Sequence, residues 1–285
     1  MFRAAEKWLI PWILRKPERP REGEPLHVIV CVCDHFEPFH KTDKDGAIAR
    51  MEEWHARFGE ICRTYKDSSG CPPRQTFFYP IEQYDADIVG MLESVCRETG
   101  SETELHLHHH DDTAESMRHA LDEGKARFAE HGFLSRDSAG DLRFGFVHGN
   151  WALDNSDPSG ANCGVKGELE LLRRAGCYGD FTMPSAPHPT QTKMVNSIYY
   201  AHQTSMPKSH DSGVIAEVGV TSEIRQKQDT LLCVQGPLAP NLKRRKFGVL
   251  PKLENAELTA VNPPTSERFS LWKNQHISVS GQPNW

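Results

Sequence analysis

The sequence lacks the cysteine patterns that mark several protein classes. Its eight cysteines include no Cys-x-x-Cys pair, so a thiolate zinc knuckle is not expected. A chain of 285 residues is also long enough to fold without disulfide staples. The N-terminus has no small-residue cleavage site of the kind that ends a signal peptide. We therefore expect every cysteine to be reduced, as in a cytoplasmic protein.

An excess of positive charge is also absent. The formal net charge is -6, which argues against an electrostatic nucleic-acid binder, because such a protein needs a basic face. The one basic cluster, residues 243–246, is interpreted as a solvated turn. No nucleic-acid partner is expected.

The N-terminal extension, residues 1–24, contains an apolar stretch that is too short to span a bilayer. This stretch runs from Trp8 to Leu14 and is interrupted by Pro11. We interpret it as a short helix docked on the domain. The alternative is a weak contact of residues 8–14 with a membrane surface, which would make the cytoplasmic protein membrane-associated.

Apolar runs and amphipathic segments alternate along the rest of the chain. Strands are expected at residues 26–33, 75–80, 103–108, 142–149, 177–184, 213–220 and 230–236. Helices are expected at residues 46–65, 82–100, 114–131 and 164–176. The proline-rich segment 183–201 is expected to form a covering loop. The alternation predicts an α/β fold with a parallel sheet, either a barrel or doubly wound, and residues 25–285 as one domain.

Polar side chains follow the ends of these expected strands. The carboxyl ends of parallel strands carry the active sites of such folds. Here they are followed by Asp34 to Glu37, by a histidine run, by His148 to Trp151, and by Asp180. We therefore expect one edge of the sheet to collect the groups that carry the chemistry.

The histidine run "ELHLHHHDDT", residues 104–113, has the composition of a metal site. Alternation along a strand would place His106, His108 and His110 on one face. Two imidazoles and a carboxylate from the next strand, such as Asp34, form a site that leaves positions open for water and substrate. The other interpretation is an exposed histidine-rich loop that binds metal adventitiously.

Four stretches resemble the NodB-type polysaccharide deacetylases, and more closely the bacterial deacetylase-like proteins found with exopolysaccharide genes. They are "CDHFEPF", "ELHLHHHDDT", "FVHGNWALDNS" and "CGVKGELELLRRAGCYGDFTMPSAPHPTQ", and they span most of residues 28–200. The resemblance implies a distorted (β/α) barrel. It also implies a metal-dependent hydrolase, most simply with Zn²⁺, that removes acetyl groups from an N-acetylhexosamine-containing polysaccharide or its precursor.

The resemblance also implies roles for individual residues. The family has two adjacent aspartates where this chain has Asp34 and His35, so Asp34 is assigned to the metal. The base role of the second aspartate then passes to Glu37, the nearest carboxylate. The two family histidines are separated by three residues, as His106 and His110 are, with His108 as the substitute ligand. The predicted catalytic groups are Asp34, Glu37 and the acid His148, and the predicted substrate-binding residues are Asn150, Trp151 and Asp180.

Two other functions remain open at the level of sequence. A glycoside hydrolase on a related barrel needs two opposed carboxylates, which Glu37, Asp154 and Asp180 could supply. A catalytically silent polysaccharide-binding or assembly protein would keep the barrel and lack the base.

The resemblance further suggests that the barrel lacks its last strand. The family has a final strand that ends in a Leu-x-His-type motif, and no such motif follows residue 276 here. The turn-like residues 281–284 before Trp285 are typical of the start of another strand. We therefore expect the domain to be C-terminally incomplete.

Overall fold

The computed structural model describes residues 4–219, 224 and 227–285. Its α-helices are α1 (Ala5–Leu14), α2 (Lys44–Thr64), α3 (Ala86–Thr99), α4 (Ala114–Glu130), α5 (Glu168–Ala175) and α7 (Ser266–Lys273). The strands in the first half are β1 (Cys33–His35), β2 (Thr76–Pro80), β3 (Glu102–Leu107), β4 (Ser135–Arg136) and β5 (Leu142–His148). The later strands are β6 (Cys177–Asp180), β7 (Ile198–His202), β8 (Gly213–Ile215), β9 (Thr230–Val234), β10 (Ala239–Lys246) and β11 (Leu250–Glu254).

The predicted α/β class is confirmed, with a nine-stranded, mostly parallel sheet in the order β1-β2-β3-β5-β6-β9-β7-β8. Strands β1, β2, β3, β5, β6 and β9 run parallel, whereas β7 and β8 are antiparallel additions and β4 pairs with β5. Within the described residues, β1 and β8 end this order and do not pair with each other. Closure into a barrel is therefore not confirmed.

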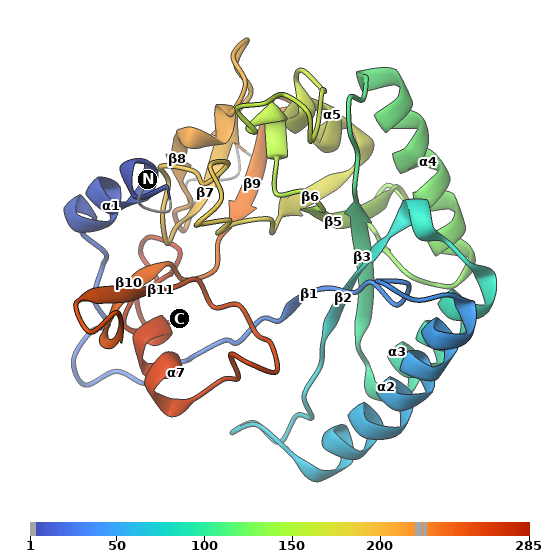
Figure 1. Ribbon diagram of the computed structural model, residues 1–285, viewed down its shortest axis with the longest axis horizontal. Coiled ribbons are helices and arrows are strands. Elements are labelled where there is room, and N and C mark those ends of the chain that lie inside the picture. The colour runs from blue at the N-terminus through green and yellow to red at the C-terminus, as the bar shows by residue number, and fades with distance from the viewer. Residues whose placement is uncertain (1–3, 220–223, 225–226) are drawn as a thin grey trace.

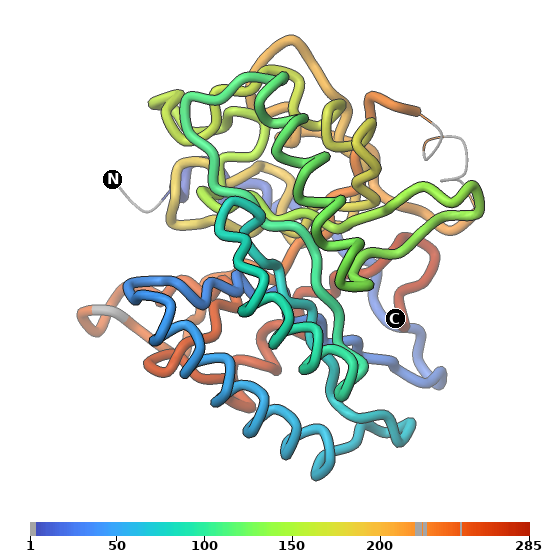
Figure 2. Tube along the Cα trace, turned by 90° about the vertical axis from the view of Figure 1, so that its right-hand side faces the viewer, coloured from blue at the N-terminus to red at the C-terminus, as the bar shows by residue number. Residues whose placement is uncertain are grey.

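Local caps fix the ends of α3 and α4, and α3 begins at Ala86 rather than at residue 82 as expected. The Asp85 side chain accepts hydrogen bonds from the first amides of α3, and Gly100 ends that helix with a φ of 69°. Thr113 and Ser116 form a reciprocal capping box at the start of α4. Helices α2, α3 and α4 lie together on one side of the sheet, and Figure 2 shows their paths from a second direction (Figure 1).

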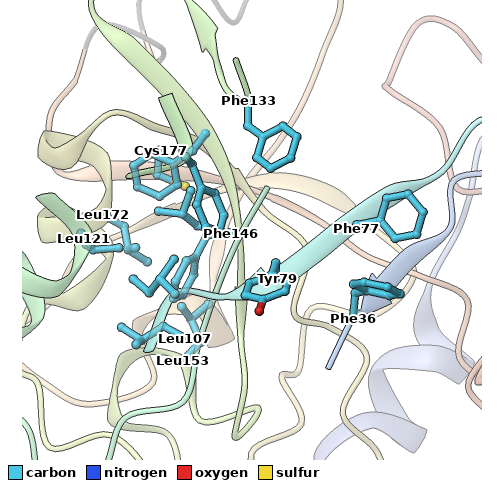
Figure 3. Packing of buried hydrophobic residues seen from close by; sticks show 14 of the residues in the cluster. Phe36, Phe77, Tyr79, Leu107, Leu121, Phe133, Phe146, Leu153, Leu172 and Cys177 are labelled. Carbon is cyan, nitrogen blue, oxygen red and sulfur yellow. The ribbon is translucent and has the colours of Figure 1, made fainter. Parts of the chain in front are cut away.

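The main hydrophobic core lies between these helices and the sheet. In Figure 3 Phe146 lies near Leu121 and Leu172, whereas Phe77 lies beside Phe36 at the other end of the same cluster. Residues of β3 point alternately to the two faces of the sheet. Leu105 and Leu107 belong to this core, and His106 between them does not. The opposite face carries His106 and Glu104, together with the buried apolar residues Phe78 and Val147.

The first predicted strand is much shorter in the structure. Residues 26–32 form no strand, and Val28, Ile29 and Val30 are exposed although they are apolar. Parallel pairing with β2 covers only Cys33–His35. An apolar run predicts a buried strand only if a neighbouring strand and a covering layer are present, and here neither reaches these residues.

The second half departs further from the predicted pattern. The segment 183–201, expected as a covering loop, contains the start of β7, which pairs with β9. The β10–β11 hairpin and α7 were not predicted. The expected strand 213–220 is present only as β8, and Val220 lies outside the described residues.

All eight cysteines are free thiols in the structure. We expect thiol titration under denaturing, non-reducing conditions to count eight. In the folded protein Cys31 and Cys71 should react first, because only they are exposed. A denatured count of six or fewer would contradict the reduced state.

Candidate metal centre

The register of the first three strands brings histidines from β1 and β3 to the face of the sheet opposite the main hydrophobic core. Phe78 of β2 pairs with His35 of β1 and with Glu104 of β3, so these residues share a face with His106. The ring centroids of His35 and His106 lie 4.6 Å apart. The pairing of the strands thus places the His35 and His106 rings in contact on one face of the sheet.

Three side-chain atoms at the end of β3 form a nearly equilateral triangle. Nε2 of His106 and Nε2 of His108 are 3.3 Å apart, and Oε1 of Glu37 is 3.4 Å from each of them. Bonds of about 2.0–2.1 Å in a tetrahedral zinc site give ligand–ligand separations of about 3.3–3.4 Å. The triangle therefore has the dimensions of three zinc ligands without any change in side-chain position.

A carboxylate outside the triangle orients His108. Nδ1 of His108 lies 2.7 Å from Oε1 of Glu82, so this nitrogen donates a hydrogen bond to Glu82 and Nε2 points to the triangle. Metal-binding histidines in proteins are held by the same kind of hydrogen bond. His35 lies beside the site. One possible ligand atom from each of His35, Glu37 and His106 lies within 4.8 Å of the other two.

The electrostatics of the site reflect this crowding. Hydrogen bonds from His106 and His108 hold the pKa of Glu37 far below its ordinary value. Hydrogen bonds to Glu37 and Glu82 raise the pKa of His108 to about 9. Burial lowers the pKa of His35 to about 3 and also lowers that of His106. Without a metal, His108 is thus held as an imidazolium, with Nδ1 facing Glu82 and Nε2 facing Glu37. A cation bound at the triangle would take the place of the Nε2 proton.

The triangle opens into a cavity of about 1930 Å³. His35, Glu37 and His108 line this cavity, as do Asn150 and Trp151 from the loop after β5. Open coordination positions would therefore face a space large enough for a substrate, which is the arrangement of a catalytic site.

The structure places Asp34 and His110 away from this triangle. Asp34 is on the opposite face of β1 from His35, and its Oδ2 accepts a hydrogen bond from Gln75. Burial and then the charge of Glu37 raise the pKa of Asp34 to about 6. His110 is exposed and its Nδ1 contacts Asp111, because the strand ends at Leu107 and the alternation does not continue. The substitute ligand His108 and the predicted base Glu37 occupy the positions that Asp34 and His110 were expected to fill.

The remaining predicted residues divide into two groups. Asn150 and Trp151 line the cavity, as expected of substrate-binding residues. Asp180 is buried and accepts hydrogen bonds from Thr182 rather than lining the cavity. The predicted acid His148 is fully buried beneath α5, and burial lowers its pKa to about 3.

A second group of side chains was not predicted from the sequence. His109, His148, Cys163 and Glu168 are buried with ligand atoms within 4.8 Å of one another, close enough to hold a metal ion. Burial favours the neutral form of Glu168, but His148 and His109 lower its pKa overall. His109 directly follows the triangle residue His108, yet Cys163 and Glu168 come from a loop and a helix start that no spacing rule connects to it.

Hydrogen bonds distinguish this second group from the triangle. Nδ1 of His148 accepts from the backbone amides of Asn150 and Ala152, so the proton of this imidazole is on Nε2. A protonated Nε2 cannot bind a metal. Nε2 of His148 instead faces Oε1 of Glu168 at 3.8 Å, and Glu168 also accepts from the Asp154 amide. The second group is thus only partly hydrogen-bonded, because Nε2 of His148 and Nδ1 of His109 have no hydrogen-bond partner among the described residues. The triangle is favoured by its ligand separations of 3.3 to 3.4 Å and by its opening into the cavity.

Comparisons of this chain with protein-family models, with curated proteins and with solved structures found no match.

Proposed function

We propose that this protein is a metal-dependent hydrolase with a Zn²⁺ site formed by Glu37, His106 and His108. We further propose the NodB-type distorted barrel and the removal of acetyl groups from an N-acetylhexosamine-containing polysaccharide or its precursor. The observation that carries the metal site is the triangle of 3.3 to 3.4 Å between the three ligand atoms, beside a large cavity. The substrate class rests on the four stretches that resemble the deacetylases.

A bound divalent cation lowers the pKa of water and polarises a carbonyl group, which is the chemistry that amide hydrolysis needs. Glu37, His106 and His108 hold the ion on its protein side. Glu82 keeps His108 in the tautomer that leaves Nε2 free. His35 and Trp151 line the cavity beside the ion, with ring centroids 6.3 Å apart.

His40 is the side chain that we assign to proton transfer. Its Nδ1 is 3.4 Å from Oε2 of Glu37, and it lines the same cavity. A histidine at this point can accept a proton from water during attack on the acetyl carbonyl and return it to the departing amine. His148 is less suited to this role, because it is fully buried and its Nδ1 is already occupied by backbone amides.

Trp151 supports a carbohydrate substrate. Its side chain is 43% exposed, and its ring lies 5.9 Å from the ring of His188 on the cavity wall. A partly exposed indole beside a metal site offers an apolar plane for a sugar ring. Of the carboxylates considered for a glycoside hydrolase, Asp154 and Asp180 are buried and do not line the cavity, so an opposed pair with Glu37 is not favoured.

The roles of Glu37 and His40 can be separated by two substitutions. Glu37→Gln should lower both metal content and acetate release, because a carboxamide is a weaker ligand than a carboxylate. His40→Ala should retain the metal and lower turnover by about 10²- to 10⁴-fold, the usual contribution of a proton-transfer group. Metal content is measured by elemental analysis. Acetate release is measured with N-acetylated oligosaccharides after the protein has been loaded with Zn²⁺.

His55→Ala is the matched control, since His55 is a similarly exposed histidine paired with Glu98 on a helix surface. It should retain both metal and turnover. If the Glu37→Gln variant keeps its full metal content, Glu37 is not a metal ligand, and a role as the base is favoured instead. A zinc-loaded protein that releases no acetate from any acetylated glycan, but still binds such glycans, would favour the silent binding protein.

A further inference from the structure

We propose that the β10–β11 hairpin, residues 239–254, docks this protein on an anionic phospholipid surface. The surface in question consists of the cations of residues 243–245 and the apolar residues Leu242, Phe247, Val249 and Leu250, which lie along the hairpin and at its turn. This inference does not depend on the proposed hydrolase activity. It assigns an interaction to a segment that the metal site does not use.

The cations of the hairpin lack compensating acidic partners. Lys243, Arg244 and Arg245 are consecutive and exposed. In the part of the chain that the structure describes, none of the three forms a salt bridge. Arg244 contacts the amide oxygen of Asn262, and Arg245 donates to the carbonyl of Val249, so both partners are neutral. Positive charge is thus concentrated at one place in a chain whose net charge is -6.

Apolar side chains are exposed among these cations. Phe247 is 83% exposed, Val249 70% and Leu242 63%. The turn at residues 259–262 adds Val261 beside the Arg244 contact, and Val261 is 91% exposed. A purely solvated turn would not gather so many large apolar groups. Cations interleaved with apolar side chains are typical of segments that bind the boundary between lipid headgroups and acyl chains.

Helix α1 lies on the same side of the molecule as the hairpin and adds exposed apolar residues there. Trp12 of α1 and Leu253 of β11 pack against one small hydrophobic cluster, and Figure 1 places α1 and the hairpin on the same side. Ile10, Ile13 and Leu14 of α1 are exposed. Trp8 is buried, so the weak membrane contact considered for residues 8–14 reduces to these three residues.

The mode of binding would be peripheral. None of the described helices is both long and apolar enough to cross a bilayer. The exposed apolar groups at the hairpin instead suit shallow insertion, with the cations at headgroup level. Nucleic acid is the competing polyanion, but phosphate contacts alone give no reason for Phe247, Val249 and Val261 to be exposed.

The test is co-sedimentation of the full chain with lipid vesicles in 0.1 M salt. We expect binding to phosphatidylcholine vesicles that contain phosphatidylserine, weaker binding in 0.5 M salt, and little binding to phosphatidylcholine alone. The triple variant K243E/R244E/R245E should bind about 100-fold more weakly, since each cation near an anionic surface contributes roughly fivefold. The variant F247S/V249S keeps every charge and should also bind more weakly, about tenfold.

The charge-matched control is K66E/R118E/K166E, which changes three exposed cations on other elements. This variant should bind vesicles as the unaltered protein does. Equal loss of binding in the control and the hairpin variant would show that only net charge matters and would overturn the proposal. Absence of vesicle binding, or binding to duplex DNA that equals or exceeds vesicle binding and is unaffected by F247S/V249S, would also overturn it.

Discussion

Replacing His106 with alanine should remove most of the bound divalent cation while leaving the far-ultraviolet circular dichroism spectrum unchanged. His106 supplies one corner of the triangle with Glu37 and His108, and it is fully buried. Loss of a direct ligand should cost at least about 100-fold in metal affinity, because changes to residues that merely support a ligand already cost about 10- to 100-fold. Elemental analysis after dialysis against a weak chelator measures the effect.

The neighbouring histidines provide the controls for this experiment. His108→Ala should lose the metal as His106→Ala does, whereas His110→Ala should retain it, since His110 is exposed and its Nδ1 contacts Asp111. The sequence alone assigned His110 to the metal and kept His108 as the substitute, so this pair of variants separates the two assignments. Metal loss in His110→Ala with retention in His108→Ala would contradict the triangle.

The second large effect is expected at Arg268, on stability rather than chemistry. Its guanidinium is fully buried, and it donates two hydrogen bonds to Glu254 at 2.8 and 2.9 Å. It also donates to the backbone carbonyls of Glu257, Asn262 and Pro263, and it lies over the ring of Trp272. One side chain thus connects α7 to β11 and to the loop between them.

Arg268→Met should lower the free energy of unfolding by about 3–5 kcal/mol, because it leaves the carboxylate of Glu254 buried without its partner. Urea denaturation followed by tryptophan fluorescence measures this change. The control is Arg174→Met, which removes an exposed pair with Glu170 on α5 and should cost less than about 1 kcal/mol. Equal midpoints for the two variants would show that Arg268 does not hold this region together.

The fold class was predictable because local signals and the alternating pattern agreed. Gly100 and Thr113 mark helix ends with backbone angles or side chains that need no tertiary contact, and the helix ends expected beside them are found there. The start of α3 was expected at residue 82 and lies at Ala86, after the cap Asp85. The β10–β11 hairpin and α7 carry weaker signals. Much of the hairpin is exposed, and α7 is held by the buried Arg268, so neither shows the apolar periodicity on which prediction depends.

The candidate site was predictable in its location and not in its ligands. Strand ends with polar residues correctly indicated the edge where Glu37 and His106 meet. Which side chains face each other depends on the register between β1 and β2 and on the residue at which β3 ends. Pairing of His35 with Phe78 puts His35 on the side of His106 and turns Asp34 away. No sequence spacing contains that information, because shifting a strand by one residue reverses every side chain.

The most direct test of the metal site is X-ray diffraction from crystals of the zinc-loaded protein, with data collected above and below the zinc absorption edge. We predict one strong anomalous difference peak, equidistant from Nε2 of His106, Nε2 of His108 and Oε1 of Glu37. A peak among His109, Cys163 and Glu168 with none at the triangle, or no peak at either place, would contradict the account.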